Sequence, residues 1–174
     1  VSAYLNIENK GYFFGIYVLT TIIMRLFYSS LSDRIGREQT LFIGCVFLIT
    51  SMILLALAET QLSYTIAAGV FGLATGVSSP TLFAWTADLS LPERRGTGSG
   101  TMFIALEAGI LFGSGMTFIF YNNTLQSAQL IFYIAAAFAL VALLTLVFQL
   151  RRKRLNGVDS DSASLNNAPN KSRV

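Results

Sequence analysis

Residues 29–38 read SSLSDRIGRE and place four charged side chains between two long apolar segments. The whole chain is 53% hydrophobic and only 12% charged, so this cluster stands apart from its surroundings. Charged residues between two apolar runs of about 20 residues are typical of a short loop on the cytoplasmic side of a membrane. Gly36 permits a tight backbone reversal there, while Arg34 and Arg37 can hold carboxylates or lipid headgroups. The pattern predicts two membrane-spanning helices joined by a charged loop.

The spacing within this loop resembles the major facilitator superfamily signature, G-x-x-x-D-R-x-G-R-[KR], which that family places after the second helix of each half. The matching positions are Ser29, Asp33, Arg34, Gly36 and Arg37. Ser29 stands where the family usually has Gly and is still small enough for close helix approach. Glu38 stands where the family usually has a base. The resemblance implies an all-α membrane protein in which these residues form the signature loop and gate transport.

The apolar segments on the C-terminal side of this loop exclude a water-soluble chain. Residues 39–58 and 60–87 contain no Asp, Glu, Lys or Arg. Each is long enough to cross a hydrocarbon core of about 30 Å. The net charge of +3 does not indicate nucleic-acid binding, because the basic residues lie in loops and form no basic face. The sequence has no His and a single Cys, so we expect no metal site, no internal disulfide and no cofactor.

We expect five membrane spans, at about 11–31, 39–58, 62–85, 98–121 and 128–150. Residues 1–10 are then an external loop, 11–154 the transmembrane helical domain and 155–174 a disordered cytoplasmic tail rich in Ser, Asn and Asp.

The basic residues predict the orientation of these spans. Those on the inner side are Arg34, Arg37, Arg94, Arg95, Arg151, Arg152, Lys153, Arg154, Lys171 and Arg173. Lys10 alone falls on the outer side, so the positive-inside rule places the N-terminus outside and the C-terminus inside. Five spans in this orientation resemble helices eight to twelve of a twelve-helix transporter, a six-helix half without its first helix. We therefore expect a missing N-terminal half of the same protein to be a partner of this fragment.

A second charged inner segment, residues 86–96, reads TADLSLPERRG. Its A-D-x-x-x-P-x-x-R-R-G run resembles the connection between the tenth and eleventh helices of the same family, and the alternative is a merely solvated loop. The matching residues are Asp88, Pro92, Arg95 and Gly96. Asp88 and Arg95 repeat the pairing of an acid with a base that Asp33 and Arg37 show in the first loop.

Two ionisable residues lie inside expected spans. Arg25 sits about two turns inside the inner boundary, where it either snorkels to the interface or forms a structural ion pair. The alternative is a cavity-facing or gating cation, which makes Arg25 a candidate proton or substrate site. Glu107 lies about 12 Å in from the inner end of its span, close to the bilayer midplane. A carboxylate costs at least about 2.5 kcal/mol there, so Glu107 should face protein or a watery cavity. It is a candidate proton or substrate site, and a purely structural polar contact is the alternative.

Glycine is distributed unevenly between the spans. The glycines expected to let helices approach closely are Gly69, Gly72, Gly76, Gly109 and Gly113. The segment 107–113, EAGILFG, resembles the glycine-rich eleventh helix of exporters in the superfamily. The second and fifth spans are poor in glycine, as the resemblance implies for the helices that lie outermost. The first, third and fourth spans would then line the cavity.

Together with the resemblance, these observations imply a secondary transporter that works by alternating access. An apolar, aromatic cavity with a lone carboxylate favours proton-coupled export of a small, fairly hydrophobic molecule, and export of a sugar or metabolite is the alternative substrate class. A non-transporting membrane receptor or scaffold on the same fold is the alternative. No nucleophile and base are paired in the sequence, so we do not expect an enzyme. The expected partners are the lipid bilayer, a small-molecule substrate and protons, and the expected location is the plasma membrane or a bacterial inner membrane.

Overall fold

The computed structural model describes residues 11–122 and 124–166, with side chains over 11–27, 35–122 and 124–152. Its elements are α1 (Tyr12–Ile35), α2 (Arg37–Ala56), α3 (Gln61–Leu89), the short 3-10 helix η1 (Pro92–Arg94), α4 (Arg95–Phe120) and α5 (Leu125–Asn166). The described ranges contain no strand, so the prediction of an all-helical chain is confirmed for them. The external loop expected at 1–10 lies outside the described residues.

Helices occupy all five expected spans, with bounds that differ at the ends. Among the residues with described side chains, four stretches are long and apolar enough to cross a membrane, and they begin at Arg37, Gln61, Pro92 and Leu125. The first expected span is α1, of which Tyr12–Phe27 is the apolar part within those residues. The helix α5 continues to Asn166, into the region expected to be a disordered tail, and 167–174 lie outside the described residues.

The charged segment at 29–38 is mostly helical, which differs from the loop expected there. Helix α1 runs to Ile35 and α2 begins at Arg37, so Gly36 alone breaks the helix. A helix satisfies its own backbone hydrogen bonds, and it can therefore carry charged side chains past the end of an apolar segment. Gly36 has φ 101°, a left-handed conformation that side chains rarely allow, and this is the backbone reversal expected from the sequence. Its carbonyl accepts hydrogen bonds from both the backbone N–H and the hydroxyl of Thr40.

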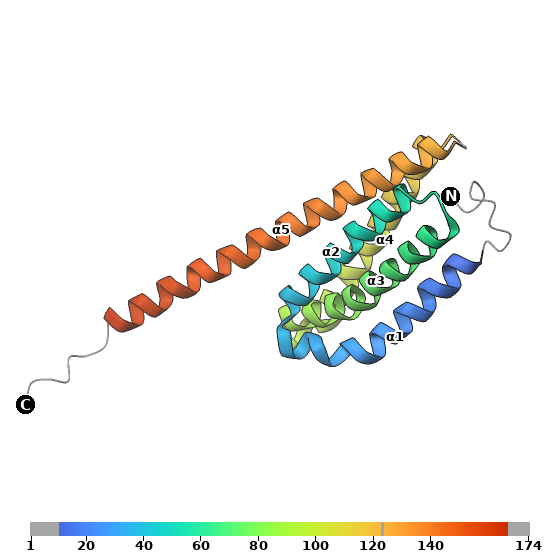
Figure 1. Ribbon diagram of the computed structural model, residues 1–174. Helices are drawn as coiled ribbons and strands as arrows, with labels where there is room; N and C mark the ends of the chain where they lie inside the picture. The colour runs from blue at the N-terminus through green and yellow to red at the C-terminus, as the bar shows by residue number, and fades with distance from the viewer. Residues whose placement is uncertain (1–10, 123, 167–174) are drawn as a thin grey trace, which may run out of the picture.

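Helix α3 is central among the first three helices. It packs against α1 on one side and α2 on the other, and α2 also packs against α5 (Figure 1). The residues of α2 and α3 that are buried by this packing are mostly small: Thr40, Gly44, Ser51, Ala56, Ala67, Ala68, Gly72, Ala74, Gly76 and Thr81. Membrane helices associate through such small side chains because lipid offers no hydrophobic driving force between them.

The contact between α1 and α3 shows how closely two backbones approach. A Cβ atom on Gly72 would lie 2.7 Å from the carbonyl oxygen of Tyr17 and 2.8 Å from Cβ of Thr20. One turn further along, a Cβ on Gly76 would lie 2.8 Å from Cβ of Met24. Beside them the buried hydroxyl of Thr21 lies 3.3 Å from the carbonyl oxygen of Gly72, within hydrogen-bond reach. The two glycines therefore allow a contact that any side chain would push apart.

The turns that precede α3 and α5 use the same cap. Thr60 precedes α3, and its hydroxyl accepts a hydrogen bond from the backbone N–H of Ser63, whose own hydroxyl accepts one from the backbone N–H of Thr60. Before α5, Thr124 and Ser127 repeat both bonds. Each cap satisfies N–H groups that have no partner within the helix, so both helices can begin after very short connections.

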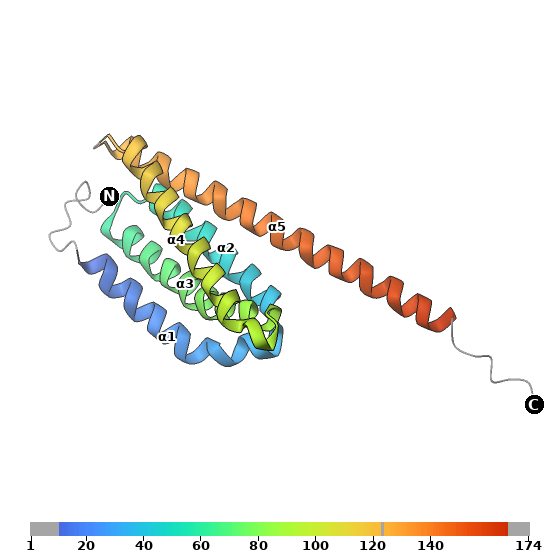
Figure 2. The ribbon, with the colours of Figure 1, turned by 180° about the vertical axis from the view of Figure 1, so that it is seen from behind.

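Helix α4 is packed more loosely than the others. None of its residues is buried, although it is apolar enough to span a membrane. Seen from behind, α4 crosses over α2 and α3, while α5 extends beyond the other helices at its C-terminal end (Figure 2). An apolar helix with no buried residue has room for further partners, although the ring of Phe112 on α4 already meets that of Phe138 on α5.

Candidate functional site

An ion pair joins the two charged segments, 29–38 and 86–96. Nε of Arg37, at the start of α2, donates a hydrogen bond to Oδ2 of Asp88, in the last turn of α3, over 3.0 Å. The two side chains are 28% and 57% exposed, so water screens their attraction. The pair therefore adds little stability, and it links the start of α2 to the end of α3, two helices that already pack along their length.

A small cavity of about 360 Å³ surrounds this ion pair. Gly36, Glu38 and Trp85 contribute to its walls together with Leu150 of α5. The C-terminal part of α5 thus lies at the same end of the bundle as the ion pair. Residues of the first signature segment and of the second inner segment meet at this cavity.

The other candidate residues of the two charged segments lie on η1, α4 and α1. Pro92 begins η1, while Arg95 and Gly96 open α4, and all three are exposed. Nothing lies within 4 Å of a Cβ built on Gly96. For the first segment, the backbone places Ser29, Asp33 and Arg34 on α1, and their side chains lie outside the described residues.

The two ionisable residues inside the spans are not brought together. Arg25 on α1 and Glu107 on α4 are both exposed. Within the described side chains neither forms an ion pair. Six residues at about 100° each put Glu107 roughly 120° around α4 from Gly113. Glu107 and Gly113 therefore lie on different faces of the helix.

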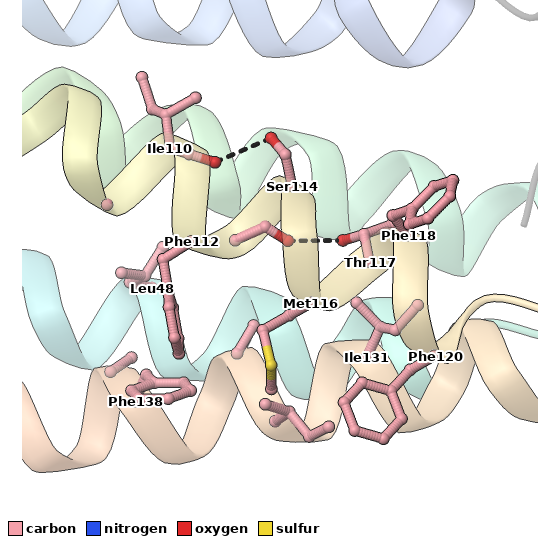
Figure 3. A pocket seen from close by; sticks show the side chains of 15 residues that line it. Leu48, Ile110, Phe112, Ser114, Met116, Thr117, Phe118, Phe120, Ile131 and Phe138 are labelled. Atoms are coloured by element: carbon pink, nitrogen blue, oxygen red, sulfur yellow. Dashed lines mark hydrogen bonds between the residues drawn. The ribbon is translucent and has the colours of Figure 1, made fainter.

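A large cavity, of about 930 Å³, lies between α4 and α5 with a contribution from α2 (Figure 3). Its walls are almost entirely apolar and aromatic, from Phe112, Met116, Phe120, Ile131 and Phe138 among others. The rings of Phe112 and Phe138 meet edge to face, with centroids 5.7 Å apart. The polar atoms nearby are already engaged, because the hydroxyls of Ser114 and Thr117 donate to backbone carbonyls of their own helix. The cavity suits an apolar occupant.

The glycines expected to pack helices fall into two groups. Gly72 and Gly76 lie in the close α1–α3 contact described above, whereas a Cβ on Gly69 would meet nothing within 4 Å. Gly109 and Gly113 also have open space and line the large cavity. Small residues on α4 therefore widen the cavity between α4 and α5.

Sequence reasoning did not identify the aromatic wall of this cavity. Gly109, Gly113, Met116 and Phe120 follow one another at spacings of three or four residues, which places them on one face of α4. That periodicity was present in the sequence, but α4 is apolar all round, so its pattern does not distinguish a cavity face from a lipid face. Gln39 and Trp85 also line the small cavity at the ion pair, and no sequence motif pointed to either residue.

Comparison with known proteins agrees with this architecture. The family model of the Major Facilitator Superfamily matches residues 4–171. Multidrug resistance protein 1 of Bacillus subtilis (strain 168) is 27% identical over 146 residues, which cover 84% of this chain and 37% of that protein. Multidrug resistance protein 2 of the same organism is 22% identical over 148 residues, covering 85% of this chain and 36% of the relative.

A third relative is solute carrier family 2, facilitated glucose transporter member 10, of Danio rerio. It is 26% identical over 117 residues, covering 67% of this chain and 23% of that protein. The chain thus spans well under half the length of the curated relatives it matches. With its apolar helices and a family match over nearly its whole length, the chain is a multi-pass integral membrane protein that belongs to the Major Facilitator Superfamily.

Proposed function

We propose that this chain is the C-terminal part of a proton-coupled secondary transporter that exports small, fairly hydrophobic compounds by alternating access. Membership in this family supports a transporter and not an enzyme. Two of the relatives are multidrug resistance proteins. Because the chain covers 37% or less of each of these relatives, the other helices of the transporter would come from the rest of the protein.

The observation that carries this proposal is the exposure of α4. This helix has the composition of a membrane span and carries Glu107 within it, yet none of its residues is buried. A carboxylate inside a membrane needs a protein partner or water, since hydrocarbon stabilises neither of its protonation states well. The face of α4 that carries Glu107 would therefore meet the substrate pathway between the two halves, and Glu107 would take up and release the coupled proton.

The proposed topology has five spans, the N-terminus outside and the C-terminus inside. Its support is the grouping of charges at one end of the bundle, where the ion pair of Arg37 with Asp88 shares a cavity with Leu150, next to Arg151. Basic residues gathered at one end are typical of the cytoplasmic side. On this topology α1, α3 and α4 would line the pathway and α2 and α5 would face lipid.

The same end would hold the inner gate. Arg37 and Asp88 connect α2 to α3, and the single-residue break at Gly36 connects α2 to α1. A rigid-body movement of one half against the other would change the surroundings of this corner first. Asp33, Arg34 and Arg95 would contribute further charges from the neighbouring positions, and Arg25 would serve either the same gate or the interface.

Flux measured in proteoliposomes tests this function. The full-length protein is reconstituted with a fluorescent, membrane-permeant hydrophobic dye, and dye movement is followed with and without an imposed pH gradient. We expect gradient-dependent dye movement that a protonophore abolishes. Binding of dye without any movement would instead indicate a receptor or scaffold on the same fold.

A further inference from the structure

A separate cavity of about 450 Å³ lies between α2 and α5, at the end of the bundle that holds the ion pair of Arg37 with Asp88. Its apolar walls come from Phe42 and Ile43 on α2 and from Val147 on α5. These two helices are in direct contact, so the cavity is a recess in a packed surface. Phe42 is 38% exposed, which shows that the recess opens to the outside of the bundle.

The rim of this cavity is polar and positively charged. Gln39 on α2 and Arg151 on α5 both line it, and both reach the surface of the bundle. Among the described side chains no carboxylate lines this cavity, whereas Glu38 and Asp88 line the adjacent one. Arg151 forms no ion pair within that same set of side chains. The rim therefore offers a cation and an amide beside an apolar recess.

The recess is too short to seat another membrane helix. Its residues on α2 run from 39 to 43, which is little more than one turn. A membrane-spanning helix needs a groove about 30 Å long to pack along its length. A single flexible acyl chain fits a much shorter recess. An occupant that ends in an anion and continues as a hydrocarbon chain satisfies both parts of the site.

We propose that this cavity binds one anionic phospholipid, with its phosphate at Arg151 and Gln39 and an acyl chain between α2 and α5. Basic pockets between membrane helices are general sites for acidic headgroups. The inference rests on the proposed function in one respect: the proposed topology places Arg151 of α5 at the inner boundary of the membrane. The two cavities share Ile35, Gln39 and Leu150, so the bound headgroup lies next to the corner where Arg37 meets Asp88.

Lipid retention in nanodiscs tests the site. The full-length protein is assembled with equal amounts of phosphatidylglycerol and phosphatidylcholine, and native mass spectrometry counts the lipids that stay bound. We expect phosphatidylglycerol to be retained selectively. Arg151→Gln should weaken this retention about tenfold, the effect of losing one charge-assisted hydrogen bond. Arg152→Gln is the matched control, because it removes the same charge from the next residue and does not line the cavity.

Two further measurements separate the site from general surface attraction. Ile43→Trp fills the recess without changing any charge, and it should reduce retention as much as Arg151→Gln does. Soluble glycerol phosphate should displace the lipid poorly, because it lacks the acyl chain. Equal effects of Arg151→Gln and Arg152→Gln, equal retention of both lipids, or full displacement by glycerol phosphate would each overturn the proposal. Lipid retention does not depend on transport. A protein that moves no substrate would therefore still retain phosphatidylglycerol, so the lipid site and the proposed function can fail independently.

Discussion

Arg37 and Asp88 are 51 residues apart in the sequence, and their side chains meet at 3.0 Å where α2 begins and α3 ends. Each belongs to a different charged segment of the sequence, and each segment separately resembles a family motif. The contact shows that the two segments form one corner of the molecule. Since both side chains are partly exposed, the contact is better suited to holding a position that can change than to stabilising the fold.

The first prediction concerns this contact. Asp88→Asn should lower the free energy of unfolding by no more than about 1 kcal/mol, the usual range for an exposed ion pair. It should nevertheless alter transport, because the pair would hold one state of the inner gate. A double-mutant cycle with Arg37→Gln and Asp88→Asn, measured for both unfolding and dye flux in the full-length protein, checks both parts.

The cycle also separates gating from folding. If the pair acts as a gate, the coupling energy in flux exceeds the coupling energy in unfolding. Parallel losses of expression and flux in the single variants would assign the pair to folding instead.

The second prediction compares two glycines on α3. Gly72→Ala should destabilise the protein by about 1–3 kcal/mol, because the new methyl group would overlap Tyr17 and Thr20 of α1. Gly69→Ala is the matched control, one turn earlier in the same helix and with open space around it. It should be neutral or stabilise by up to about 1 kcal/mol through helix propensity. Thermal unfolding in detergent measures both, and equal destabilisation by the two would contradict the close contact between α1 and α3.

The third prediction concerns the break between α1 and α2. Gly36 has φ 101° with nothing within 4 Å of an added Cβ, so the cost of a substitution there is conformational and not steric. Gly36→Ala should destabilise by about 1–3 kcal/mol. Gly96→Ala, also in open space but inside a helix, should not destabilise. If Gly36→Ala unfolds at the same temperature as the parent, the left-handed turn is not required.

The sequence predicted the helices well because long apolar runs leave few alternatives. The runs without charge at 39–58 and 60–87 became α2 and α3 with ends shifted by only a few residues. The ends were harder to predict, since a helix can continue past its apolar part with solvated charges, as α1 does up to Ile35. Hydrophobic periodicity does not locate a helix end unless a residue there interrupts the helical backbone. Gly36 is such a residue, and it separates α1 from α2.

The candidate site was predictable only in part. Motif spacing pointed to Arg37 and Asp88 separately, and their meeting depends on how α2 and α3 pack, which no local pattern records. Similarly, the glycines of α3 and α4 look alike in the sequence. Gly72 nevertheless lies in a tight contact and Gly113 beside a cavity, because α3 has helices on both sides and α4 does not.

The last prediction rests on Glu107, which lies in the middle of α4 on an exposed face of the helix and does not itself line the large apolar cavity. In the full-length protein this face would meet the substrate pathway, where a carboxyl group can exchange a proton as the pathway alternates between wet and dry. The sequence has no His that could share this task. Glu107→Gln keeps the shape of the side chain and removes only its titration, so folding should be preserved.

We therefore expect Glu107→Gln to express and unfold like the parent while dye flux loses most of its response to an imposed pH gradient. If an acid elsewhere in the transporter shares the proton, the response weakens without disappearing, and the residual response should then be lost on substituting that second acid. Glu93→Gln is the matched control, since Glu93 is exposed in the short helix η1, at the N-terminal end of the stretch that contains Glu107. The measurement is dye flux in proteoliposomes with and without the pH gradient. If the flux of Glu107→Gln follows the gradient like that of the parent, Glu107 has a structural role. A glutamine side chain does not titrate, so it cannot carry the coupled proton.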